Sequence, residues 1–389
     1  WQEKTRDVED ALSDALHAAL TQRFVDRRTA VLYRSLKERR DLLAAVTGDG
    51  EVLVSYNRGE AFEAEDLRVF LSRSHDGGRT WSNEGRLGVP EIPAGVSEGA
   101  KLVRVGDGTI VGLFQRHDRR GLPGEGLTHS ETLGFVPTRF ETTTSIDGGR
   151  TWSEPVLVEP PIEGPEWELC APVTELSDGR WLLITSTWPD WSGRLPNGHQ
   201  LVAFVSNDRG ASWPEWMSVM SEPGSEAVIF WESKIVELPD GRLLAVAWCH
   251  DLPAAEDRPN QYALSSDGGA TWTPHRSTGL IGQTQTPLVI GDGRMLVVYR
   301  RTDEPGLWLQ DVRIEGDEWV NAATRPLWGH GQAGSTRMGD SMAENFRALR
   351  FGAPSVVRLD DGAVFVVFWC YEDNVSVIRW FRLELIDEA

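Results

Sequence analysis

Short apolar, β-branched runs recur along this chain, and the clearest of them each follow an Asp-Gly pair. These runs are RWLLITSTW (180–188), RLLAVAWCH (242–250), RMLVVYRR (294–301) and AVFVVFWCY (363–371). Because Asp-Gly between apolar runs favours the tight turn of a β-hairpin, each pair predicts a hairpin. Six such pairs are present: Asp49-Gly50, Asp107-Gly108, Asp178-Gly179, Asp240-Gly241, Asp292-Gly293 and Asp361-Gly362.

The spacing of these hairpins predicts the architecture. Successive pairs lie 52 to 71 residues apart, about the length of a four-stranded antiparallel unit with its loops. A single sheet of this kind cannot bury both of its faces, whereas six sheets around a common axis bury them against one another. The sequence therefore predicts an all-β fold, a six-bladed β-propeller.

An octet with the pattern Ser-x-Asp-x-Gly-x-x-Trp occurs four times, at 74–81, 145–152, 206–213 and 265–272. Each copy follows an Asp-Gly pair at the distance expected for the turn between the third and fourth strands of a blade. Ser and Asp side chains can bond local backbone amides, and Gly supplies a backbone state that other residues avoid. The octet is therefore predicted to be a folding device. The stretch IEGDEW (314–319) is a shortened copy in blade five.

The two ends of the chain are expected to complete the ring. After Asp361-Gly362 only two strands remain, so the segment TAVLYRS (29–35) is predicted to supply the missing strand of blade six. Residues 6–24 carry apolar side chains at helical spacing, which predicts a short N-terminal amphipathic helix. The predicted division is a helical segment over 1–28 and a single propeller over 29–389.

Composition narrows the partners. The formal net charge of −20 argues against nucleic acid and against an anionic membrane as binding partners. Three cysteines form no disulfide framework, and no spacing suggests a metal or a cofactor motif. Free thiols favour a cytoplasmic location slightly over secretion. Because the predicted N-terminal helix could dock on the propeller or mediate a dimer, a monomer or a homodimer is expected.

Topology predicts which face carries the site. The Asp-Gly turns and the octets share one face, so a ligand is expected at the other, where the innermost strands begin and the loops between the second and third strands lie. That face mixes arginines with carboxylates, and the arginine fork suits a carboxylate ligand. Candidates for ligand binding are Arg40, Arg58, Arg116, Trp188, Arg300, Arg301, Arg347 and Arg350, and candidates for catalysis are Asp66, Glu232, His250 and Tyr371.

The octet is the Asp-box, and over residues 36–385 the chain resembles the sialidase superfamily. The resemblance implies a glycosidase that holds an acidic sugar with an arginine triad. It implies that Arg40, at the start of blade one, is the first triad arginine. It also implies that Asp66 is the general acid/base and that Glu232 in WESKIVELPDG is the carboxylate that supports the nucleophile.

The chain departs from this pattern at two positions. The second triad arginine should follow Glu232 at the end of the next strand, where His250 and Asp251 stand, and the nucleophilic tyrosine should occupy the position of Ala353. Arg300 or Arg301 is left as the third arginine. Asp66 and Glu232 could still hydrolyse a glycoside as a carboxyl pair.

The prediction is therefore a sialidase-like glycoside hydrolase that acts on the end of an acidic glycan with a non-standard active site. A polysaccharide lyase, with His250 or Tyr371 as the base, is one alternative. A non-catalytic glycan-binding propeller is the other.

Overall fold

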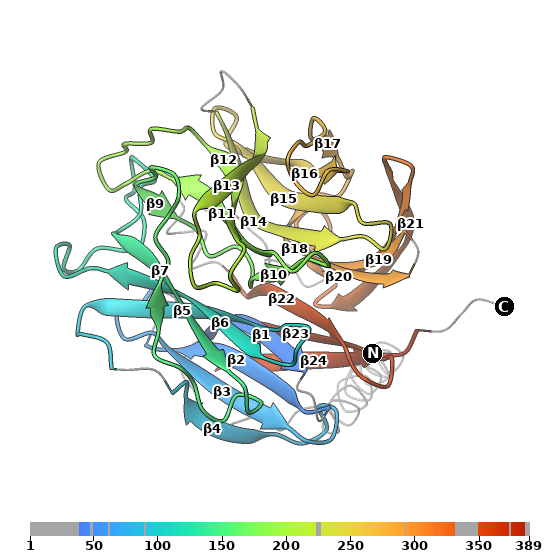
Figure 1. Ribbon diagram of the computed structural model, residues 1–389, viewed down its shortest axis with the longest axis horizontal. Helices are drawn as coiled ribbons and strands as arrows, with labels where there is room; N and C mark the ends of the chain where they lie inside the picture. Colours follow the sequence, from blue (N-terminus) through green and yellow to red (C-terminus); the bar gives the residue numbers. More distant parts are fainter. Residues whose placement is uncertain are drawn as a thin grey trace, which may run out of the picture.

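The computed structural model describes residues 39–46, 50–60, 63–88, 91–222, 227–291, 293–330, 349–372 and 375–385. Over these residues the chain forms six antiparallel sheets, or blades, arranged around one axis (Figure 1). The predicted six-bladed all-β propeller is confirmed. The predicted helix, the closing strand at 29–35 and the domain boundary near residue 28 lie outside the described residues.

In the first three blades the strands follow one another from the axis outward. Blade one contains β1 (Arg39–Val46), β2 (Val52–Arg58), β3 (Arg68–Ser74) and β4 (Ser82–Arg86). Blade two contains β5 (Val96–Arg104), β6 (Ile110–Asp118), β7 (Thr138–Ser145) and β8 (Val156–Leu157). Blade three has its innermost strand in two pieces, β9 (Glu166–Trp167) and β10 (Thr174–Glu175), followed by β11 (Trp181–Trp188), β12 (Gln200–Ser206) and β13 (Glu215–Ser221).

The last three blades repeat this order. Blade four contains β14 (Val228–Glu237), β15 (Leu243–Asp251), β16 (Glu256–Ser265) and β17 (Arg276–Ser277). Blade five contains β18 (Gly282–Gly291), β19 (Arg294–Arg301), β20 (Gly306–Glu315) and β21 (Glu318–Trp328). Blade six contains β22 (Phe351–Arg358), β23 (Val364–Glu372) and β24 (Val375–Leu383) within the described residues.

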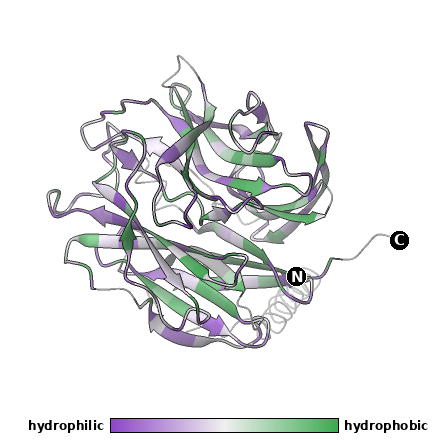
Figure 2. Ribbon diagram, viewed as in Figure 1, coloured by the Kyte–Doolittle hydropathy of each residue, from purple (hydrophilic) through white to green (hydrophobic). Residues whose placement is uncertain are grey.

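The hydrophobic core lies between the blades. Leu182 and Ile184 of blade three, for example, share a buried cluster with Ala245 of blade four. Each pair of neighbouring blades has such a cluster, including blade six with blade one. Figure 2 shows the corresponding hydrophobic stretches along the strands. Burial between sheets, rather than within one sheet, explains why the strands alternate so little between apolar and polar residues.

The octets form self-contained turns. In blade one the Ser74 Oγ donates to Asp76 Oδ1 at 2.8 Å, and Asp76 Oδ1 accepts the Thr80 amide at 2.8 Å. The same serine-to-aspartate bond, at 2.8 Å, occurs in the other three octets. The Trp81 ring packs between blades, with its centroid 5.6 Å from that of Trp380 in blade six. This bonding supports the folding role predicted for the octet.

The octets also join each blade to the one before it. Arg150 of the second octet donates to Glu51, beside the first Asp-Gly turn, at 3.1 Å. Arg209 of the third octet pairs with Asp107 of the second Asp-Gly turn. Arg180, beside the third Asp-Gly turn, donates to the Gly268 carbonyl of the fourth octet at 2.9 Å. The octets and the Asp-Gly turns therefore share one face, as predicted.

Candidate functional site

A cavity of about 830 Å³ runs along the propeller axis. Its wall comes from the innermost strands of all six blades and the residues next to them, which supply 45–46, 98–99, 101–104, 168–175, 232, 234–237, 284, 286–289, 353–358 and 360. At the end away from the Asp-Gly turns, Leu67, His117, Leu127 and Phe135 from the loops and neighbouring strands extend the wall. The cavity is therefore open to side chains from every blade, as a ligand site at a propeller axis requires.

A repeated irregularity in the innermost strands aims side chains into this cavity. Strands β14, β18 and β22 each have a bulge, which disturbs the pairing register at 231–234, 283–286 and 352–355. The first extra residue of each bulge is Glu232, Thr284 or Ala353, with φ of 46°, 56° and 46°. All three residues line the cavity. Positive φ in a non-glycine residue is strained, and such residues cluster at functional sites.

Glu232 and Glu168 form a carboxyl pair in this wall. The Glu232 amide lies 3.3 Å from Glu168 Oε1 and 3.2 Å from Glu168 Oε2. The Cys170 thiol donates to Glu168 Oε2 at 3.1 Å. Burial, followed by the nearby Glu232 carboxylate, raises the pKa of Glu168 to about 7. Glu168 therefore holds a proton near neutral pH, whereas an ordinary glutamate does not.

The predicted site residues take different places around this pair. Glu232 lines the cavity wall, as the sequence predicted. Asp66 is exposed, and its Oδ1 accepts the Glu60 amide at 3.0 Å within the loop between β2 and β3. It does not belong to the described cavity wall. Arg40 lies in β1 with its backbone opposite Asn57, and Arg347 lies outside the described residues.

Two predicted arginines are buried. Arg300 donates from Nη1 to the Phe351 carbonyl at 3.0 Å and also bonds Gln283 Oε1. Burial lowers the pKa of its guanidinium, and the nearby Glu232 carboxylate acts in the opposite direction. Arg116 pairs with Glu98 and, at 2.9 Å, with Glu141. Arg116 is thus engaged by two carboxylates, while Arg300 lies beside the candidate site.

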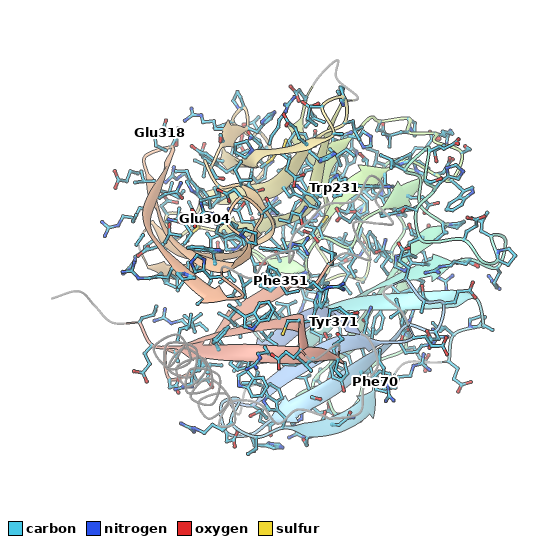
Figure 3. All side chains as sticks on the ribbon, turned by 180° about the vertical axis from the view of Figure 1, so that it is seen from behind. Phe70, Trp231, Glu304, Glu318, Phe351 and Tyr371 are labelled. Carbon is cyan, nitrogen blue, oxygen red and sulfur yellow. The ribbon has the colours of Figure 1, made fainter. Side chains whose placement is uncertain are left out.

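The other predicted arginines and Tyr371 lie nearer the surface. Arg58 stacks over Phe70, and Arg301 pairs with Asp303 at 2.7 Å. Tyr371 donates its amide to the Arg350 carbonyl at 2.9 Å, and the Arg350 guanidinium lies 5.5 Å from the Tyr371 ring centroid. Figure 3 shows Tyr371, Phe351 and Trp231 toward the middle of the molecule, and Glu318 at its rim.

An aromatic cluster carries the last two predicted residues. Trp188 stacks on Phe135 at 4.8 Å and meets Trp231, the residue before Glu232, at 5.1 Å. His250 lies against Trp231 and bonds Asp257 through Nδ1 at 2.8 Å. This histidine–aspartate pair connects through Gln283 to Arg300. The cluster therefore packs directly behind Glu232.

Sequence reasoning did not single out Glu168 as a neighbour of Glu232. The residue falls in the stretch WELC, where the innermost strand of blade three breaks between β9 and β10. Periodicity gives no signal there, because a regular strand would place Glu166 and Glu168 on one face. In the structure Glu166 instead accepts the Thr138 hydroxyl at 2.6 Å. Among the described residues, no group of three or more His, Cys, Asp and Glu side chains is placed to bind a metal.

Comparison with known proteins gives relatives of one kind. A sialidase from Micromonospora viridifaciens is 28% identical over 243 residues, which are 59% of this chain and 35% of that protein. A sialidase from Bacteroides fragilis is 26% identical over 258 residues, which are 58% of this chain and 43% of that protein. The aligned region thus spans less than half the length of these relatives. No family model matches the chain.

Solved structures share the fold. A protein of unknown function from Dyadobacter fermentans superposes with a TM-score of 0.68 at 19% identity, over 91% of this chain and 96% of the other. The NanB sialidase from Streptococcus pneumoniae superposes with a TM-score of 0.63 at 14% identity, over 92% of this chain and 71% of the other.

Among the described residues, no helix has the length and apolarity that a membrane crossing needs.

Proposed function

We propose that this chain, whose curated relatives are sialidases and whose fold is that of solved sialidases, is a glycoside hydrolase acting on the end of an acidic glycan. The observation that carries the proposal is that Glu168 and Glu232 line the axial cavity as neighbours, with the Glu168 carboxylate on the Glu232 backbone amide and the Glu232 charge raising the pKa of Glu168. Glycoside hydrolysis needs one carboxyl group that is protonated and one that is ionised. A shared burial site separates the titration of two neighbouring carboxyl groups.

In this proposal Glu168 is the general acid and Glu232 is the carboxylate. The pKa of Glu168, raised to about 7 by burial and by Glu232, keeps a proton available for the leaving oxygen. Glu232 sits on a strained bulge that presents its side chain to the cavity. It would act on the sugar ring as nucleophile or as the base that activates water.

The residue at the bulge of blade six supports a carboxylate mechanism over a tyrosine mechanism. Ala353 occupies in β22 the position that Glu232 occupies in β14, and both have φ of 46°. A methyl group there can neither attack a sugar nor hold a proton. The nucleophile implied by the family resemblance is therefore replaced by a carboxyl chemistry in this proposal.

Positive charge beside the pair supports an acidic substrate. Arg300 is buried, and its guanidinium interacts electrostatically with the Glu232 carboxylate. Gly352 makes room for it, because a Cβ at that position would lie 2.8 Å from Arg300 Nη1. Arg40 is the second residue of β1 in blade one, and its role as a ligand-binding arginine stays a prediction from the sequence.

A uronate lyase is the second candidate, and the hydrogen bond between His250 and Asp257 favours it. A histidine oriented by a carboxylate is a suitable base for removing the C5 proton of a uronate. This reaction gives an unsaturated sugar with strong ultraviolet absorbance, which a hydrolase does not produce.

The test uses the full chain with para-nitrophenyl glycosides of N-acetylneuraminate, glucuronate and galactose, and an unsubstituted polyuronate for the lyase reaction. We expect release from an acidic glycoside and little from the neutral galactoside. Glu232→Gln and Glu168→Gln should each lower kcat on the order of 10²–10⁴-fold, because each amide keeps the shape of the side chain and loses its proton chemistry.

Asp66→Asn is the matched comparison, because Asp66 is the acid predicted from the sequence. A loss with Asp66→Asn and full activity with Glu168→Gln would assign the acid to the loop instead. Ultraviolet absorbance without glycoside release would favour the lyase. Binding of acidic sugars with no turnover of any substrate would leave a glycan-binding propeller and sink the hydrolase proposal.

A further inference from the structure

Lysine is rare in this chain and its placement is specific. The sequence has four lysines against 35 arginines. Two of them, Lys101 and Lys234, fall within the described residues, and both line the axial cavity. The other described cations are arginines, many of them paired with carboxylates at the rim. An ammonium differs from a guanidinium in being a compact point charge with three donors.

Lys234 keeps donor capacity toward the cavity. Its Nζ donates to the Cys170 carbonyl and to the Glu232 carbonyl, each at 2.8 Å. An ammonium has three N–H groups, so one is left over from these two bonds. Burial, and next the charge of Lys101, lowers the pKa of Lys234 to about 8.

Lys101 has more capacity still. It lies on β5 of blade two, with 9% of its surface exposed, and it lines the same cavity. Within the described part of the chain its ammonium makes no hydrogen bond. A buried cation without a bonded anion is costly, and a bound anion removes that cost.

Titratable groups of blades two, three and four lie around the two lysines. Blade two contributes Glu98, which forms an ion pair with Arg116 and accepts a hydrogen bond from the Val69 amide. Blade three contributes Glu168 and the Cys170 thiol, and blade four contributes Glu232. When Glu168 holds its proton, two ammonium groups face a single carboxylate of the pair.

We propose that Lys101 and Lys234 form an anion subsite in the wall of the axial cavity, and that this subsite binds the carboxylate of a sugar acid. This inference rests on the proposed function, because it assumes that an acidic sugar enters the cavity. It adds two lysines, on blades two and four, to the positive charge that Arg300 supplies beside Glu232. A neutral sugar gains nothing from them.

The test measures binding of glucuronate, of glucose as its neutral counterpart, and of inorganic phosphate by titration calorimetry with the full chain. The variants are Lys101→Met and Lys101→Gln, with Arg313→Met on the exposed side of β20 as the charge-matched control. We expect both Lys101 variants to weaken glucuronate binding roughly 30-fold or more and Arg313→Met to leave it unchanged. Lys234→Met should weaken it as well, with circular dichroism reporting whether that variant folds.

Equal glucuronate affinity in wild type and in folded Lys101→Met would overturn the subsite while leaving hydrolysis by the carboxyl pair intact. Phosphate that binds as tightly as glucuronate, with the same dependence on Lys101, would overturn the assignment to a carboxylate. If the wild type neither binds nor cleaves any acidic sugar, the proposed function and the subsite both fail.

Discussion

Carboxylates at the octet turns and carboxylates in the axial cavity are set up in opposite ways. Asp267 of the fourth octet accepts the hydroxyl and the amide of Thr271 and the hydroxyl of Ser265, and these bonds lower its pKa to about 2. Glu168 in the cavity is buried beside Glu232, and its pKa rises to about 7. Hydrogen-bond donors set the pKa of the first group, whereas burial and a like charge outweigh the donors around the second.

The difference separates a folding role from a chemical role. A carboxylate that is saturated with donors stays ionised and holds a turn, but it has no proton to give. A carboxyl group whose burial and like-charged neighbour outweigh its donors is costly to ionise and keeps its proton near neutral pH. In the proposed function, the same residue class serves stability on one face and chemistry at the axis.

The largest expected change in the free energy of unfolding comes from replacing Glu168 with a side chain that cannot ionise. The folded pKa of Glu168 lies above its ordinary value of 4.5, so the folded state holds a proton that the unfolded state has released between about pH 4.5 and 7. The free energy of unfolding should then fall as the pH rises through that window. Glu168→Gln cannot ionise, so it should be more stable than wild type at pH 8, by up to a few kcal/mol.

Urea denaturation of both proteins at pH 5 and pH 8 measures this difference. Asp267→Asn is the control of opposite sign: it should be less stable than wild type by the same amount at pH 5 and at pH 8, because the pKa of Asp267, lowered to about 2, confines its pH dependence to the range below about pH 4. A wild type and a Glu168→Gln variant with the same pH dependence would remove the basis for treating Glu168 as an acid.

The next effect concerns an octet. Asp147 accepts the Ser145 hydroxyl at 2.8 Å and the Thr151 amide at 2.9 Å in the turn between β7 and β8. Asp147→Ala should lower the free energy of unfolding by about 1–3 kcal/mol, because it leaves these donors without an acceptor. Chemical denaturation measures the change, and glycosidase assays at a temperature where the variant is folded should match wild type. Lost ligand affinity in the folded variant would contradict a purely structural octet.

The smallest effect concerns a link between two blades. Arg150 reaches from the second octet to Glu51, but its side chain is half exposed. Arg150→Ala should change the free energy of unfolding by less than about 1 kcal/mol, since solvent screens exposed ion pairs. The same denaturation measurement applies. A larger loss would mean that the rim contacts, and not the cores between blades, hold the ring together.

The sequence could predict the fold well because short local motifs specify the turns of each blade and recur along the chain. Asp-Gly and the octet are short signals whose chemistry is complete within eight residues or fewer, and each copy reinforces the others. Glu232 could be located in the same way, because its distance to Asp240-Gly241 fixes its place on the innermost strand. Its lining of the cavity follows from that register.

The site as a whole could not be predicted, because its contacts join residues of different strands that are far apart in the sequence. Glu168 has no special sequence context, and only the break between β9 and β10 brings it to the Glu232 amide. Arg116 is an arginine on the predicted ligand face, yet its guanidinium forms ion pairs with Glu98 and Glu141. Sequence spacing predicts where a side chain starts, but the partner it meets depends on three-dimensional packing.

At the bulges of Glu232, Thr284 and Ala353, the wall of the axial cavity accepts side chains of different chemistry. The backbone conformation at each is the same, although the three side chains are a carboxylic acid, an alcohol and a methyl group. The strain of this conformation is borne by the main chain, at about 1–3 kcal/mol each, whatever side chain is attached. A single codon change at one of these positions can therefore exchange the chemistry that faces a ligand without rebuilding the scaffold. A propeller of this type could acquire, lose or relocate a reactive group one blade at a time during its evolution.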